Sequence, residues 1–325
     1  MLTNCNLAYR VNGYSLSVKR LIGLQIVILV LILSVGCQKN TEQLRIGIIK
    51  PSIDHLPLTY TIAQNELAIN KYKVVTFTSG WEAQEALIGK KIDVAILPFT
   101  FAWNAAAKGY PVKIVSFLEW QSDGIVVRKG INRIQDLNNK RIGVLKASTI
   151  DVLMQDFAVK YNIQYTPVYF RSPNEQIAAL RSEKLDGIVS YVPTIQKLDK
   201  VYPVLHWFGT DYPMHPCCDI VVNTESLSKH REKLLYSMCK AINKQAPRLH
   251  SFGNDIVKII GKNYGLNREQ AASALEHTGF MMGLELSGRD FERKMVRLAV
   301  KSGYIDKLPS DDDIYWDITS KYEDR

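Results

Sequence analysis

The chain has 325 residues, of which 46% are hydrophobic and 22% charged, an ordinary globular mixture long enough for one large domain or two modest ones. Its formal net charge is +9, but no run of Lys and Arg with interleaved aromatic residues occurs, so we expect no nucleic-acid partner. Cys217, Cys218 and Cys239 are the cysteines beyond residue 37, and such a set does not form a disulfide framework.

The N-terminal segment is the one anomaly in composition. Residues 1–20 carry Arg10, Lys19 and Arg20 but no acidic residue, and residues 21–35 are almost wholly apolar. A helix of that apolar length rises about 22 Å, which is less than the roughly 30 Å hydrocarbon core of a bilayer. A basic start followed by a short apolar run is therefore typical of an export signal.

The apolar run ends at Gly36 and Cys37. This junction resembles a bacterial lipoprotein signal, in which a small residue precedes a cysteine that receives a diacylglycerol, although Ser34 stands where the pattern usually has Leu. The resemblance implies a signal peptide over 1–36, a tether over 37–44, and a lipid on Cys37 that anchors the exported protein to the periplasmic or cell-surface side of a bacterial membrane. A plain secretory signal, or a single-pass anchor with an incidental cysteine, is the alternative.

After the tether, short apolar runs alternate with segments of helical periodicity. Strands are predicted at 45–49, 73–79 and 92–98, and helices at 56–70 and 81–91. Strands that alternate with crossover helices at these lengths predict a parallel α/β sheet.

The same order returns further along the chain. The second block has predicted strands at 141–148, 167–172 and 185–192 and predicted helices at 149–162 and 173–184. Its letters repeat as well, because Arg-Ile-Gly opens the first strand of both blocks and an acid, Asp93 or Asp186, opens the third. We therefore predict two similarly built α/β lobes, with chance agreement of short stretches as the alternative.

Two further segments read alike, "DGIVVRK" at 123–129 and "CDIVVNT" at 218–224. We interpret them as two hinge strands that connect the lobes. This places lobe one at 45–127 and 218–325, and lobe two at 128–217.

The last hundred residues, 226–325, read as mainly helical and are expected to pack on lobe one. Ser228, Asn267 and Ser287 each precede a helical pattern and are predicted N-caps.

This organisation resembles the solute-binding proteins of bacterial ABC importers. The segments "HLPLTYTIAQNEL", "EALIGKKIDVAILP" and "GIVVRKGINRIQDLNNKRIGVLKAS" are similar to the branch that carries nitrate, taurine and other sulfonates, bicarbonate or pyrimidine-type thiamine precursors (NitT/TauT, NMT1-like). In the third segment Asp136, Leu137, Lys140 and Gly143 match the family pattern, whereas Asn138–Asn139 replaces its glycine.

The resemblance covers residues 44–305. It implies a two-lobed α/β fold of the periplasmic-binding-protein type II, with two lobes joined by two hinge strands. It also implies capture of a small-molecule solute in an interlobe cleft by hinge closure, and an ABC permease and ATPase as partners.

Open parallel sheets bind ligands beyond the carboxyl ends of their strands. By this rule the candidate ligand-binding residues are Ser52, Asp54, His55, Ser79, Trp81, Thr100, Trp120, Ser148, Thr149 and Tyr191. Several have plainer alternatives: helix capping for the Asp, Ser and Thr residues, a solvated loop position for His55, and packing for the tryptophans. Few Arg or Lys residues stand in these loops, which favours a neutral, zwitterionic or aromatic solute over a strong anion.

The stretch "MHPCCD" at 214–219 adds Cys217 and Cys218 to the expected cleft. The alternatives for this pair are a thiophilic metal or organometallic site, a strained vicinal disulfide, and buried packing. On the same fold, a thiamine-pyrimidine-synthase-like enzyme could use the pair as nucleophile with His55 or His215 as base. Because no G-x-S-x-G, H-E-x-x-H or P-loop motif occurs, we predict a binding protein with no catalytic residue, cofactor or resident metal.

Overall fold

The computed structural model describes residues 43–318. The predicted signal peptide, the lipid anchor at Cys37 and almost all of the tether lie outside these residues. Within the described part of the chain, no helix is both long and apolar enough to cross a membrane.

Lobe one is built on a six-stranded sheet. Its strands are β1 (Leu44–Ile49), β2 (Tyr72–Phe77), β3 (Val94–Pro98), β4 (Val112–Gln121), β10 (Pro216–Asn223) and β11 (Thr278–Gly283). Their order in the sheet is β11-β4-β10-β3-β1-β2. Strand β1 runs parallel to β2 and β3, whereas β10 is antiparallel to β3 and β4.

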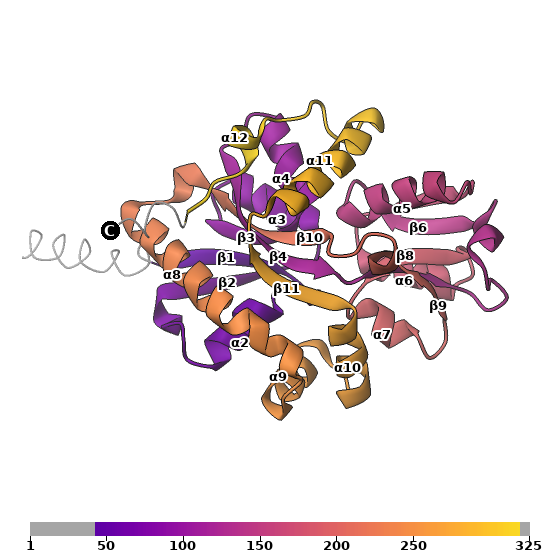
Figure 1. Ribbon diagram of the computed structural model, residues 1–325, viewed down its shortest axis with the longest axis horizontal. Helices are drawn as coiled ribbons and strands as arrows, with labels where there is room; N and C mark the ends of the chain where they lie inside the picture. Colours follow the sequence, from indigo (N-terminus) through magenta and orange to yellow (C-terminus); the bar gives the residue numbers. More distant parts are fainter. Residues whose placement is uncertain (1–42, 319–325) are drawn as a thin grey trace, which may run out of the picture. The chain divides into compact units, whose positions relative to one another are not determined.

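Helices cover both faces of this sheet (Figure 1). They are α2 (Leu56–Ala63), α3 (Gly80–Ile88), α4 (Phe99–Ala107), α8 (Lys229–Gln245), α9 (Asn254–Tyr264), α10 (Arg268–Glu276), α11 (Leu286–Lys301) and α12 (Asp311–Ile314). Successive strand residues face opposite sides: Ile220 packs in the cluster that contains Leu235 of α8, and Val221 in the cluster that contains Phe99 and Met295 of α4 and α11. The C-terminal helices α8 and α11 thus pack on lobe one.

Lobe two is built on a five-stranded sheet. Its elements are β5 (Asp123–Val127), β6 (Arg141–Leu145), α5 (Thr149–Lys160), β7 (Thr166–Phe170), α6 (Pro173–Arg181), β8 (Gly187–Tyr191), α7 (Thr194–Leu198) and β9 (Val204–Trp207). The strand order is β7-β6-β8-β5-β9. Leu180 and Ile195 place α6 and α7 on one face of this sheet, and Phe157 places α5 in the cluster on the other. Short 3-10 turns lie at Ile69–Lys71, Ile134–Leu137, Phe208–Thr210, Thr224–Ser226 and Ala246–Ser251.

The two predicted hinge strands are each confined to one lobe. In the sheets of the described chain, strand β5 pairs with β8 and β9, and strand β10 pairs with β3 and β4. The chain therefore enters lobe two at residues 121–123, and the expected boundary at 127 moves back to about 122. Gln121 and Ser122 make this crossing with φ of 65° and 76°, a left-handed backbone that is uncommon outside glycine.

Three local expectations differ from the structure. The predicted helix 56–70 ends at Ala63, followed by Asn65 in a left-handed turn with φ 58°. Residues 278–283, part of the segment predicted to be mainly helical, form β11 because they pair with β4. Ser228 and Asn267 do cap their helices, but the N-cap of α11 is Glu285 rather than Ser287.

Candidate functional site

A cavity lies between the lobes, at the carboxyl ends of their parallel strands. Lobe one contributes Asp54, Trp81 and Glu119 to its wall, and lobe two contributes Thr149 and Tyr191. The space between its atoms, counting the mouth, is about 620 Å³, but the centre of a water molecule can occupy only about 60 Å³ of it. The cavity is therefore narrow in this conformation, with the two lobes close together around it.

Most of the residues chosen from the sequence meet at this cavity. Its lining includes Ser52, Asp54, Ser79, Trp81, Ser148, Thr149, Tyr191, Cys217 and Cys218. These residues lie far apart in the chain. They meet at the cavity because most of them lie at or just after the end of a strand, while the two thiols lie at the start of one.

Three predicted residues do not line the cavity. Trp120 is 1% exposed and its indole N–H donates to the carbonyl of Met281 at 2.9 Å, so it is a core residue. Thr100 is buried in α4. His55 is also buried rather than solvated: its Nδ1 lies 3.0 Å from Oδ1 of Asp54, and its ring packs against Tyr264.

The hydroxyl groups at the cavity divide into capping and non-capping roles. Ser79 caps α3 by accepting from the backbone N–H of Glu82 at 3.3 Å. Ser148 occupies the N-cap position of α5, but its hydroxyl donates to the carbonyl of Leu145 at 2.6 Å. Thr149 reaches across the lobes, because its Oγ1 donates to the carbonyl of Cys217 at 3.4 Å.

Two buried acids in the cavity wall, Glu119 and Asp123, were not among the predicted site residues. Glu119 is 1% exposed, and its Oε1 has no hydrogen-bond partner among the described residues. Burial, with a smaller contribution from the charge of Asp123, raises the pKa of Glu119 well above its usual range. The sequence did carry a signal for it, since Glu119 is the one acid in the strand "VKIVSFLEWQ" and stands between apolar residues, Leu118 and Trp120.

Asp123 contacts the buried ring of His215. Nδ1 of His215 lies 2.7 Å from the carbonyl of Tyr212, which can only accept, so this nitrogen donates. Nε2 of His215 lies 3.3 Å from Oδ2 of Asp123. The ring of His215 thus bridges the backbone of Tyr212 and the side chain of Asp123 and holds this carboxyl group in place.

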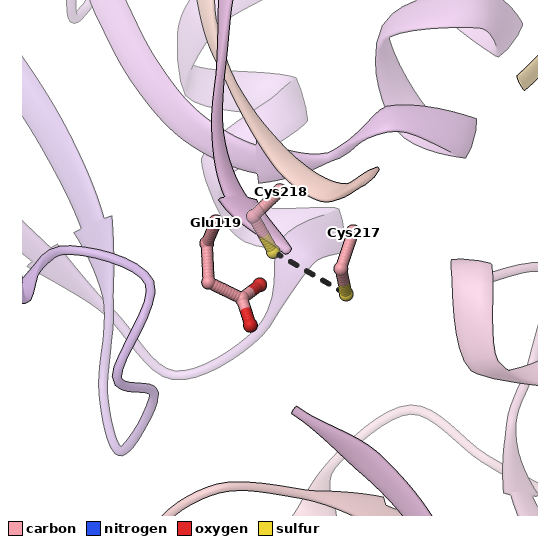
Figure 2. Close-up of side chains that lie close together, drawn as sticks. All are labelled: Glu119, Cys217 and Cys218. Atoms are coloured by element: carbon pink, nitrogen blue, oxygen red, sulfur yellow. Dashed lines mark hydrogen bonds between the residues drawn. The ribbon is translucent and has the colours of Figure 1, made fainter. Parts of the chain in front are cut away.

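The two thiols lie side by side at the start of β10 (Figure 2). Sγ of Cys218 is 3.9 Å from Sγ of Cys217, which is in turn 3.6 Å from Oδ1 of Asp123. Both cysteines are reduced, and each is 5% exposed. The hydrogen bond to Cys218, followed by burial, raises the pKa of the Cys217 thiol, and burial raises that of Cys218, so both are neutral thiols near pH 7.

The acidic and basic residues at the cavity differ in burial. Asp54, Glu119 and Asp123 are buried in its wall, whereas Lys146 and Arg171 of lobe two also border it but are exposed. The aromatic rings of Trp81 and Phe101 meet edge to face at 5.2 Å between centroids. The buried part of the wall thus offers carboxyl groups and thiols, and the exposed part offers two cations.

Two α/β lobes with a cavity between the carboxyl ends of their strands define the type II periplasmic-binding-protein fold, which confirms the predicted fold. Residues 102–247 match the family model described as NMT1/THI5 like, which confirms the resemblance drawn from the sequence. Comparison with curated proteins finds no match.

Solved structures share the fold over most of the chain at low identity. The ligand-binding component of an ABC-type import system from Staphylococcus aureus, solved with zinc bound, has a TM-score of 0.75 at 19% identity, covering 86% of this chain and 98% of that one. The periplasmic aliphatic sulphonate binding protein SsuA from Escherichia coli has a TM-score of 0.68 at 19% identity, covering 85% of this chain and 97% of that one. The periplasmic nitrate-binding protein NrtA from Synechocystis PCC 6803 has a TM-score of 0.68 at 12% identity, covering 87% of this chain and 88% of that one.

Proposed function

We propose that this protein is the extracytoplasmic solute-binding component of an ABC importer. It captures a small solute between its lobes by hinge closure and delivers it to a permease and ATPase in the membrane. The observation that carries the proposal is that the cavity wall is shared by the two lobes, so that closure both encloses the solute and completes the site. The similarity to import components with the same fold supports the proposal.

The chemistry of the cavity favours a nitrogen heterocycle of the pyrimidine or thiamine-precursor type over a nitrate-like anion or a sulfonate. An anion placed deep in the cavity would face Asp54, Glu119 and Asp123. A protonated Glu119 can instead donate to a ring nitrogen and accept from an amino group, and its Oε1 is unpartnered within residues 43–318. Trp81 supplies a half-buried aromatic ring beside it.

The same geometry disfavours an enzyme that uses the thiol pair as nucleophile. The attacking species would be a thiolate, but burial and mutual hydrogen bonding keep Cys217 and Cys218 protonated. In the described part of the chain, neither candidate base is hydrogen-bonded to a thiol: His55 contacts Asp54, and His215 contacts Asp123 and Tyr212. We therefore propose a binding role with no catalytic residue.

Export and anchoring complete the proposal. The basic, apolar and Gly-Cys segments of residues 1–37 would direct secretion and place a lipid on Cys37. Replacing Cys37 with Ala should abolish signal processing and membrane association, as measured by fractionation after a carbonate wash. A variant that stays with the membrane would point to a transmembrane anchor instead.

Native mass spectrometry of freshly purified protein tests the solute-binding role. We expect an adduct of small mass that is lost on denaturation, and protection against thermal unfolding by an aminopyrimidine but not by nitrate or taurine. Glu119→Gln should weaken that binding, and Glu285→Gln, on the N-cap of α11, is the matched control. Protection by taurine or nitrate that is unaffected by Glu119→Gln would overturn the solute class and leave the import role standing.

A further inference from the structure

The start of β10 contains a distortion that gives Cys217 and Cys218 a common orientation. In a regular strand, adjacent side chains point to opposite faces. Here Pro216 pairs with Trp120 and Cys218 with Glu119, so Cys217 is an extra residue without a partner on β4. A β-bulge of this kind re-aims side chains, and the two sulfur atoms come to lie 3.9 Å apart.

Glu119 lies opposite this bulge, across the ladder between β4 and β10, with its carboxyl group beside the two thiols (Figure 2). One ligand atom from each of Glu119, Cys217 and Cys218 lies within 4.8 Å of the other two. All three side chains border the interlobe cavity, so a position beside them is open to a further ligand.

The spacing of the sulfur atoms suits a shared metal ion. With a Zn–S distance of about 2.3 Å, two thiolates on one tetrahedral zinc are roughly 3.8 Å apart, and about 4.0 Å apart in a trigonal arrangement. The observed 3.9 Å lies between these values, whereas a disulfide would need about 2.05 Å. The two sulfur atoms could thus hold an ion without moving relative to each other.

The carboxyl group of Glu119 is available for the third bond. Its Oε1 is buried and has no hydrogen-bond partner in the described chain, which is costly unless something else supplies one. Around the site, Asp123 contacts Sγ of Cys217 at 3.6 Å and is itself held by His215. This contact orients the Cys217 side chain before an ion binds, and the thiol proton that makes it is released on binding.

We propose that Glu119, Cys217 and Cys218 form a binding site for a thiophilic divalent cation of the Zn²⁺ type, with its fourth position facing the cavity. Two sulfurs and one oxygen are a ligand set for zinc or cadmium rather than for magnesium or calcium. Each thiol and the carboxyl group of Glu119 lose their protons to solvent as they bond to the ion, and no electron is transferred. The site goes beyond the proposed function, because binding of the ion requires neither an organic solute nor a permease.

Titration of the purified, reduced and metal-free protein with Zn²⁺ under anaerobic conditions tests the proposal. We expect one ion per chain by calorimetry, and a heat that changes with the ionisation enthalpy of the buffer because protons are released. Cd²⁺ should add a thiolate-to-metal charge-transfer band, which reports sulfur ligation directly. Affinity should rise with pH, since protons compete with the metal for the sulfurs.

The variants separate this site from adventitious binding. Cys217→Ser/Cys218→Ser should lose affinity by more than about 100-fold, and Glu119→Gln by roughly 10- to 100-fold, by analogy with the effects of perturbing metal ligation. Cys239→Ser, a buried cysteine on α8, is the matched control and should bind as the wild type does. Circular dichroism and thermal melting of every variant establish that it is folded.

Two results would overturn the proposal: wild-type protein that shows no charge-transfer band with Cd²⁺, or Zn²⁺ binding unchanged in the double serine variant. If that variant fails to fold, the wild-type band and the Glu119→Gln titration still decide. These measurements use no organic solute, so a failure to find a solute by native mass spectrometry is a separate outcome.

Discussion

The two lobes are built from the same unit, although the chain reaches the second only by interrupting the first. The strand order β2-β1-β3-β10-β4 of lobe one has the same directions as β7-β6-β8-β5-β9 of lobe two. The similar segments "DGIVV" and "CDIVVN" are the antiparallel strands β5 and β10, which take equivalent places in the two sheets. What had been interpreted as a pair of hinge strands is thus part of the internal repeat.

An equivalent ion pair occurs in both lobes. It connects the N-terminal ends of β1 and β3 in lobe one and of β6 and β8 in lobe two. In lobe one, Arg45 donates to Asp93 from its backbone at 2.9 Å and from its guanidinium at 2.9 and 2.6 Å. In lobe two, Arg141 donates to Asp186 in the same way, at 2.8, 3.2 and 3.2 Å. Each aspartate also returns its own backbone N–H to the carbonyl of that arginine, at 2.9 Å in both lobes. The repeated letters therefore encode one repeated contact.

The lobes differ where their strands end at the cavity. Lobe one contributes both thiols and the buried acids Asp54 and Glu119, whereas lobe two contributes one buried acid, Asp123, together with Thr149 and the exposed Lys146 and Arg171. The two lobes share the residues that form the framework of the repeat, but they differ in the side chains at the ends of their strands. This is the division expected when a rigid framework positions variable functional ends.

The largest expected effect comes from breaking the two equivalent ion pairs. The Asp93 side chain is 0% exposed and is shared between Arg45 and Arg231, whereas that of Asp186 is 24% exposed. Asp93→Ala should lower the free energy of unfolding by about 3 kcal/mol because it removes the buried carboxylate that both guanidinium groups contact. Asp186→Ala should cost less than about 1 kcal/mol. Urea unfolding of both variants measures the difference, and equal losses would show that burial does not distinguish the pairs.

Gly47 and Gly143, each on the first strand of its lobe, are expected to respond alike. An added Cβ would lie 2.5 Å from Cδ1 of Ile92 at Gly47, and 2.7 Å from Cδ1 of Leu185 at Gly143. Alanine at either position should destabilise by about 1–3 kcal/mol through overpacking. Ile92→Val should recover part of the loss for Gly47→Ala, because it removes the clashing methyl group, and Leu185→Val should do so for Gly143→Ala. The packing argument would be contradicted if the double variant lost as much unfolding free energy as the two single variants lose in sum.

The pH dependence of stability should also separate the lobes. Burial raises the pKa of Glu292, on α11 of lobe one, to about 7. A raised carboxyl pKa means that the folded state holds a proton that the unfolded state releases, so stability falls between about pH 4.5 and pH 7, by at most about 1.4 kcal/mol per pH unit. The hydrogen bond from Arg141 lowers the pKa of Asp186, whose contribution is instead lost as pH falls below about 4.

Unfolding measured from pH 3 to pH 8 checks both signs. Glu292→Gln should flatten the decline towards pH 7, and Asp186→Asn should flatten the decline towards acid. Glu292 accepts hydrogen bonds from the indole of Trp103 at 2.7 Å and the hydroxyl of Tyr315 at 2.8 Å, which glutamine can still accept. A wild-type curve that rises steadily up to pH 7, unchanged by Glu292→Gln, would refute the first sign.

The smallest expected difference concerns the thiols. Cys217 and Cys218 are 5% exposed and Cys239 is 4% exposed, so the static surfaces do not separate them. Only the first two border the interlobe cavity, and lobe opening would expose them to solvent. After mild reduction they should alkylate several-fold faster than Cys239, and a bound solute should slow them. Equal rates for the three thiols, unchanged by solute, would mean that the cavity does not open.

Much of the fold was determined by the sequence alone. Apolar runs and helical periodicity predicted six strands (β1, β2, β3, β6, β7 and β8) and three helices (α3, α5 and α6) to within a few residues, because these elements are buried on one or both faces. The repeat between Arg45–Asp93 and Arg141–Asp186 was visible because each pair lies at fixed positions of a short local unit. Most of the residues named by the rule for the ends of parallel strands also line the cavity.

Only the tertiary structure decided the rest, since it depends on contacts between distant segments. Strand β11 exists because residues 278–283 pair with β4, not because of their own propensity. The adjacent Cys217 and Cys218 face one side because β10 bulges where it meets β4. That bulge also brings Glu119, nearly a hundred residues earlier in the chain, beside the thiols. The register that places Glu119 there is a property of the pairing between β4 and β10, so it cannot be predicted from either strand alone.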